Sequence, residues 1–84
     1  MIEDMMNQDE KINSDKLDSF FKDKIKVHII LNRRLADGTL SWLNGFIIKR
    51  SSERVWIIKE DKLGEIRLSI SEIKDVKQWG RRGR

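Results

Sequence analysis

The stretch from Asn44 to Ile73, near the middle of the chain, places the tightest limits on its fold. Three short runs rich in Ile, Val, Phe and Trp are separated there by two polar segments, RSSE at 50–53 and DKLG at 61–64. β-branched and aromatic residues favour strands, whereas Ser, Asp and Gly favour turns. The pattern predicts a three-stranded antiparallel meander. Such a small sheet is stable only when one face is covered, so the flanking segments have to provide the cover.

A short amphipathic helix is expected before the meander. Leu17, Phe20 and Phe21 follow helical spacing, and Asn13 or Ser14 can cap the helix at its N-terminus. We place this helix at about residues 14–24. The acidic residues 1–12 show no hydrophobic periodicity, and we expect them to be disordered.

Apolar residues alternate with polar ones from about residue 25 onward, which predicts strands. They are expected at about 25–31, 39–49, 54–60, 65–70 and 74–79, followed by a basic flexible tail at 80–84. Gly45 interrupts the second strand and indicates a sharp bend. We therefore expect a mainly β domain over residues 13–79, a small five-stranded, strongly bent antiparallel barrel of the SH3-like type with a short N-terminal α-helix.

The faces of the second and third strands are assigned by parity. Trp42 and Phe46 share their parity with Leu40 and Ile48, so we expect them mainly in the core. The third strand is apolar on both faces, which favours a central position or a subunit interface. Trp56 is the residue of that strand that we expect to stack on a ligand or to contact another subunit.

The composition argues against several classes of function. The chain has no Cys and one His, so disulfides, thiolate metal sites and multi-histidine sites are not expected. Neither Glu60-Asp61 nor Ser51-Ser52 has a neighbour that would complete a catalytic site, and we expect a non-enzymatic protein without a cofactor. No apolar run is long enough to span a membrane, and the polar N-terminus is unlike a secretory signal. These features favour a soluble cytoplasmic protein.

The charge is distributed unevenly along the chain. Residues 1–20 contain two Lys against six Asp or Glu, and residues 21–84 contain 16 Lys or Arg against eight Asp or Glu. A net charge of +8 on the sheet region attracts polyanions, and single-stranded nucleic acid is bound by basic grooves with aromatic platforms. The candidate contacts are Arg33, Arg34, Arg50, Arg54, Arg67, Arg81 and Arg82, and the candidate platforms are Trp42, Phe46, Trp56 and Trp79.

Three segments resemble the Sm-like proteins, which include the eukaryotic Sm and LSm proteins and bacterial Hfq. LDSFF at 17–21, before VHIIL, is similar to the helix that leads into the first strand of Hfq. GTLSWLNGFI at 38–47 is similar to the second-strand pattern of the family. SISEI at 69–73 is similar to the closing segment of the fourth and fifth strands of Hfq. In one alignment Gly38 is the family glycine, and in another it is Gly45. Arg67 and Leu68 stand where Hfq has a Lys-His pair, so the basic group is kept and the histidine is not.

The resemblance implies a homo-oligomeric ring of six or seven protomers that binds single-stranded RNA without catalysis. Strand four of one protomer would pair with strand five of the next, and Arg67 and Asn44 would repeat around a pore. Two other interpretations remain open. One is a small basic barrel that binds DNA as a chromatin or regulatory protein, and the other is a barrel that binds a partner protein through its third strand.

Overall fold

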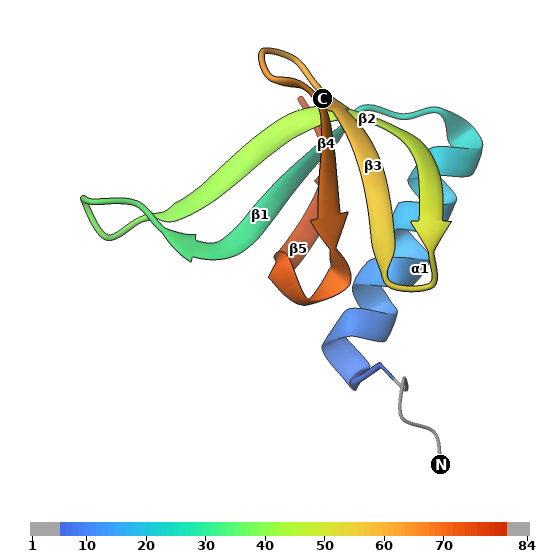
Figure 1. Ribbon diagram of the computed structural model, residues 1–84, viewed down its shortest axis with the longest axis horizontal. Coiled ribbons are helices and arrows are strands. Elements are labelled where there is room, and N and C mark those ends of the chain that lie inside the picture. Colours follow the sequence, from blue (N-terminus) through green and yellow to red (C-terminus); the bar gives the residue numbers. More distant parts are fainter. Residues whose placement is uncertain (1–5, 81–84) are drawn as a thin grey trace.

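One antiparallel sheet and one helix make up the computed structural model, which describes residues 6–80 (Figure 1). The elements in chain order are α1 (Gln8–Asp23), β1 (Val27–Arg34), β2 (Leu40–Ser52), β3 (Val55–Glu60), β4 (Gly64–Ser69), the 3-10 helix η1 (Ile70–Glu72) and β5 (Ile73–Gln78). The strands lie in the order β4-β3-β2-β1-β5. The expected class, a mainly β chain of five antiparallel strands with an N-terminal helix, is confirmed. β2 is the central strand, β3 lies between β4 and β2, and β4 and β5 form the two edges of the sheet.

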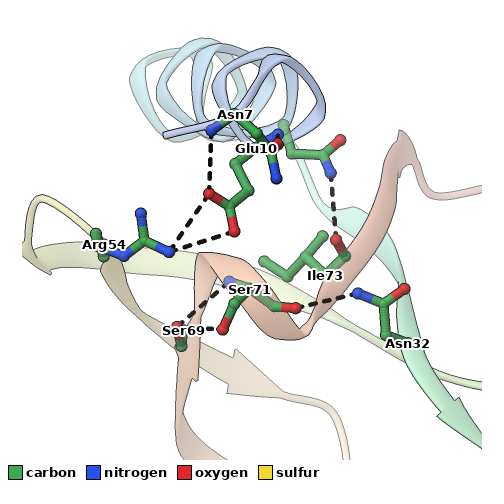
Figure 2. Close-up of polar contacts among 8 residues, drawn as sticks. Asn7, Glu10, Asn32, Arg54, Ser69, Ser71 and Ile73 are labelled. Carbon is green, nitrogen blue, oxygen red and sulfur yellow. Dashed lines mark hydrogen bonds and ion pairs between the residues drawn. The ribbon is translucent and has the colours of Figure 1, made fainter. Parts of the chain in front are cut away.

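The helix begins earlier than the sequence pattern predicted. Asn7 is its N-cap: the Asn7 side chain accepts a hydrogen bond from the Glu10 N–H (2.8 Å), and the Glu10 carboxylate accepts one from the Asn7 N–H (3.3 Å). Figure 2 shows this reciprocal capping box. The prediction of disorder over residues 1–12 is therefore wrong for residues 8–12, and residues 1–5 lie outside the described part of the chain.

Asn13 and Ser14 do not cap the helix but lie buried where it meets the sheet. The Asn13 amide donates to the backbone carbonyls of Ile73 and Lys74 at 3.3 Å each, and Ser14 lies beside Arg50. Asn13 thereby satisfies two backbone oxygens that the helix would otherwise cover, and the Ser14 hydroxyl accepts a hydrogen bond from the Arg50 guanidinium. They fix where α1 sits on β5, next to the fully buried Leu17.

Ion pairs between α1 and the sheet explain the acidic character of the N-terminal region. They join Lys16 to Asp75 (2.9 Å), Asp18 to Arg50 (3.2 Å) and Glu10 to Arg54 (3.2 Å). The Glu10–Arg54 pair lies next to the capping box in Figure 2.

The same figure shows η1, where Asn32 donates to the Ser71 carbonyl (3.1 Å) and the Ser69 and Ser71 hydroxyls lie 3.0 Å apart.

Gly45 lies at a close approach of two strands. A Cβ atom on Gly45 would lie 2.2 Å from the Lys59 carbonyl oxygen, so only glycine fits here. β2 curves strongly over the sheet (Figure 1), as the interrupting glycine predicted. The strand continues to Ser52, so residues 50–52 belong to β2 and not to the expected turn.

Gly45 also decides which face of β2 is buried. It is buried together with Leu43 and Ile47, and this leaves Trp42 and Phe46 on the opposite, exposed face. The prediction that Trp42 and Phe46 belong to the core is wrong: they are 55% and 46% exposed. The hydrophobic core consists of Leu17, Val27, Ile29, Leu31, Leu43, Ile47, Trp56, Ile58, Leu68, Ile70, Ile73 and Val76.

Trp56 is fully buried in this core, so its predicted exposure is also wrong. Bulges in the pairing of β2 with β3 shift the register between Ile47 and Lys49 and again between Arg50 and Ser52. The extra residues lie in β2, so they change which β2 side chains face inward. β3 alternates regularly, and its inner face is the one that carries Trp56 and Ile58. Within residues 6–80, no helix has the length and apolar character needed to cross a membrane.

Candidate nucleic-acid interface

An open hollow of about 600 Å³ lies on the exposed face of the sheet. We call it the tryptophan hollow; it is lined by His28, Trp42, Asn44, Lys77, Gln78, Trp79 and Gly80. Its centre follows from the strand register, because His28 on β1 pairs with Asn44 on β2 and with Lys77 on β5. Directly paired residues point to the same side of a sheet, so three strands contribute to one surface.

Two exposed indoles border the tryptophan hollow. Trp42 is 55% exposed, and its ring centroid lies 5.5 Å from that of His28 with the planes tilted by 39°. Trp79 is 44% exposed, and the Lys26 ammonium lies 4.1 Å from its ring centroid, in cation–π geometry. The Lys26 ammonium also forms an ion pair with the Asp61 carboxylate, with 2.6 Å between Nζ and Oδ2. The hollow therefore combines aromatic faces with the basic side chain of Lys77, and Lys26 lies over the Trp79 ring.

Asn44 connects His28 to Trp79 at the side of the hollow. Its amide lies 2.7 Å from His28 Nδ1, and only one orientation of the amide satisfies all neighbours. In that orientation the Asn44 nitrogen donates to His28 Nδ1 and to the Leu43 carbonyl (3.3 Å), and the Asn44 oxygen accepts from Trp79 Nε1 (3.3 Å). Trp79 Nε1 can only donate, so it fixes the direction of both hydrogen bonds.

A second hollow of about 240 Å³ contains two of the predicted arginines. This arginine hollow is lined by Leu31, Arg33, Ser41, Trp42, Leu43, Glu60, Leu63, Ile66, Arg67, Leu68 and Glu72. Arg33 and Arg67 are exposed there, and Trp42 separates the two hollows. A third hollow, between Trp42, Asn44 and residues 60–63, borders Trp42 as well.

Carboxylates limit the positive charge of this region. Glu60 accepts hydrogen bonds from the backbone N–H groups of Leu63 (2.8 Å) and Lys62 (2.7 Å), and these bonds lower its pKa below the ordinary value. Glu60 is therefore a fixed negative charge at neutral pH, next to Asp61. The most favourable position for a phosphate is consequently on the Lys77 side of Trp42.

The structure places the other predicted contacts outside the hollows. Arg50 anchors the helix: its guanidinium donates to Asp18, to Ser14 Oγ (3.1 Å) and to the Glu53 carbonyl (2.7 Å), and it lies 4.7 Å from the ring centroid of Trp56. These contacts occupy both terminal nitrogens of Arg50, and its contact with a nucleic acid stays a prediction. Trp56 is fully buried, so the prediction that it stacks on a nucleic acid is wrong. Arg34 donates to the Gly38 carbonyl (2.6 Å) in the hairpin between β1 and β2. Arg81 and Arg82 lie outside the described residues.

Lys77 was not among the predicted contacts, and Trp42, although one of the candidate platforms, was expected mainly in the core. The signal for Trp42 was present in the sequence, because a glycine packed against a neighbouring strand has to lie on the inner face together with Leu43 and Ile47. No sequence pattern places Lys77 beside His28, since that pairing depends on β5 returning to β1.

Residues 6–80 contain no group of three or more His, Asp or Glu side chains that could hold a metal ion. Comparisons with protein-family models, with curated proteins and with solved structures found no match to this chain. A function therefore has to follow from the geometry of the two hollows and of the sheet that carries them.

Proposed function

We propose that the protein is a non-catalytic, single-stranded RNA-binding protein of the Sm-like type. The observation that carries this proposal is that two exposed indoles, Trp42 and Trp79, line one hollow together with Lys77. Large aromatic side chains are seldom left exposed together on a soluble domain without a binding role. Bases stack on such rings, and each stacked base contributes about 1–3 kcal/mol.

The basic side chains around the indoles fit a phosphate backbone that follows the stacked bases. Lys26 and Lys77 lie beside Trp79, and Arg33 and Arg67 lie on the other side of Trp42. A strand that crosses Trp42 would pass from one pair of cations to the other. Duplex bases are already stacked on one another and cannot cover an indole, so the exposed rings favour single strands.

The edges of the sheet support assembly of several copies. β4 and β5 each pair with a single neighbour among the described strands, and the β5 carbonyls of Ile73, Lys74 and Val76 also accept hydrogen bonds from Asn13 and Lys16 of α1. The unpaired backbone edge is therefore that of β4 together with the part of β5 that is not bonded to α1. Pairing of β4 with β5 of a second copy would satisfy both edges and, when repeated, generate a closed homo-oligomeric ring of six or seven protomers, as the resemblance to the Sm-like proteins implies. A ring would present several tryptophan hollows to one RNA and raise its apparent affinity.

Binding to a labelled oligonucleotide of about twelve residues tests the proposal. We expect fluorescence anisotropy to show binding of single-stranded RNA that weakens steeply between about 50 and about 400 mM salt. Trp42→Ala should weaken binding by about tenfold, the equivalent of roughly one stacked base.

Phe46→Ala is the matched control for Trp42→Ala. Phe46 is also an exposed aromatic on β2, but it lines none of the three hollows that Trp42 borders. Its loss should leave affinity unchanged. Equal losses in both variants, or binding that is insensitive to salt, would contradict the proposal. Stronger binding to duplex DNA than to single strands would favour the DNA-binding alternative instead.

A further inference from the structure

The free edge of β5, on the side away from β1, is not open to a further strand along its whole length. Its outward positions follow from the alternation of an antiparallel pair, in which residues that bond to the neighbouring strand alternate with residues that do not. The Trp79 N–H donates to the Lys26 carbonyl (3.0 Å), and the register between β1 and β5 stays regular over the next four pairs. Val76 and Gln78 therefore direct their backbone N–H and C=O groups away from β1, toward the free edge.

Both outward groups of Val76 already have hydrogen-bond partners. Its N–H donates to Asp75 Oδ1 (2.8 Å), and its carbonyl accepts from Lys16 Nζ of α1 (3.4 Å). Lys16 and Asp75 also form an ion pair with 2.9 Å between Nζ and Oδ1. One pair of side chains thus fills the two hydrogen-bonding positions that an added strand would use at Val76.

Asn13 occupies the beginning of β5 in the same way. Its buried side-chain amide donates to the carbonyls of Ile73 and Lys74 at 3.3 Å each. The hydrogen bonds from α1 end at Val76, two residues before β5 ends at Gln78. A strand that paired along β5 would have to take over the backbone groups that α1 now holds.

β4 differs from β5 at this point. It pairs with β3 from Gly64 to Ser69, and the described side chains make no hydrogen bond to the backbone of residues 64–68. The nearest such bond is the one from the Ser69 N–H to the Glu72 carboxylate (3.0 Å), at the last residue of the strand. The two edges that a ring has to join are therefore unequal, because β4 is open and β5 is largely occupied by α1.

We propose that α1 competes with β4 of a second copy for the β5 edge and thereby sets the protein concentration at which the ring forms. This inference rests on the assembly part of the proposed function. Asn13 and Lys16 hold the backbone groups in the free protomer, and the backbone of β4 replaces them in the assembly. Leu17 lies fully buried between these two residues in the sequence, so it keeps α1 on its own protomer while Asn13 and Lys16 release the edge.

Variants that remove only the edge contacts test the competition. Lys16→Met removes the ammonium group but keeps an unbranched side chain, and Asn13→Leu removes the amide but keeps a side chain of similar volume at the buried position. Light scattering over a dilution series gives the concentration at which half of the chains are assembled. Each variant should lower this concentration by about fivefold, the equivalent of about one hydrogen bond.

Asp18→Asn is the matched control for the two edge variants. It breaks the ion pair between α1 and Arg50 (3.2 Å), which lies on β2, and it leaves the contacts with β5 in place. Circular dichroism at the lowest concentration checks that each variant is folded. Asp18→Asn should assemble at the wild-type concentration. An equal shift in Asp18→Asn and Lys16→Met would show that any loosening of the helix promotes assembly, and it would overturn the inference.

The remaining outcomes separate this inference from the proposed function. If the wild type and both edge variants assemble at the same concentration, the competition is overturned and the ring is kept. If all three stay monomeric at every concentration, the ring and the inference fall together. Binding of single-stranded RNA by such monomers would leave the RNA-binding part of the proposed function intact.

Discussion

Replacing Gly45 with alanine tests the close approach that bends β2. The new Cβ would lie 2.2 Å from the Lys59 carbonyl oxygen, 2.8 Å from the Lys59 carbonyl carbon and 2.9 Å from the Glu60 Cα, whereas ordinary contact begins at 3.4 Å. All three neighbours are backbone atoms, so no side chain can rotate away. β2 and β3 would have to separate by about 1 Å, which strains the hydrogen bonds between them.

We expect Gly45→Ala to lower the free energy of unfolding by about 3 kcal/mol. Overpacking of a buried site costs about 1–3 kcal/mol, and a weakened ladder hydrogen bond adds about 1 kcal/mol. The entropy that alanine removes from the unfolded chain offsets less than about 1 kcal/mol. For a domain of this size the change corresponds to a fall in Tm of roughly 12–24 °C.

Urea and thermal unfolding, followed by circular dichroism at one fixed protein concentration, measure this effect. Gly38→Ala is the matched control, because Gly38 has a positive φ of 92° but no atom within 4 Å of the added Cβ. It should lose only about 1 kcal/mol, from backbone strain. If Gly45→Ala is as stable as Gly38→Ala, β2 and β3 do not approach as described and the assignment of Trp42 to the exposed face loses its basis.

Three further predictions concern the core, the helix and the assembly. Trp56→Ala should lower the free energy of unfolding by about 3–5 kcal/mol in urea titrations, because it removes the largest fully buried side chain; a loss below about 1 kcal/mol would contradict its burial. Burial acts to raise the pKa of Asp75, but hydrogen bonds from Lys16 and from the Val76 N–H, together with nearby lysine charges, lower it overall. A carboxylate whose pKa is lower in the folded than in the unfolded protein stabilises the fold at pH values above the unfolded-state pKa, and this stabilisation is lost as the pH falls. Asp75→Asn should therefore be less stable than wild type at pH 7 and equally stable at a pH well below the ordinary pKa of 3.8. Light scattering should give six or seven times the 10.0 kDa chain mass, and a monomer would refute pairing of β4 with β5.

The sheet was predictable because its strands are marked by local signals. Turn residues at Asp37-Gly38 and near Gly64 separate runs of β-branched residues, and each run became a strand. The buried positions of β1 also followed the expected alternation, with Val27 and Ile29 inside. A regular strand needs no more than its own sequence to reveal which face is apolar.

The site could not be predicted in the same way, because it depends on contacts between distant segments. The bulges in β2 depend on pairing with β3. β3 is apolar on both faces, so only the packing of the sheet shows that the face with Trp56 is the inner one. The helix starts at Gln8, after the N-cap Asn7, and Glu10 of its capping box also pairs with Arg54, more than forty residues away. The tryptophan hollow likewise needs β5 beside β1 to bring Trp79 next to Asn44.

The three indole N–H signals of the protein provide the most direct test of the proposed site. Trp42 and Trp79 border the tryptophan hollow, and Trp56 is fully buried, so one proton–nitrogen spectrum contains two reporters and an internal control. On titration with single-stranded RNA, we expect the signals of Trp42 and Trp79 to shift and that of Trp56 to stay in place. Bound RNA that leaves the Trp42 and Trp79 signals unmoved would contradict binding at this hollow.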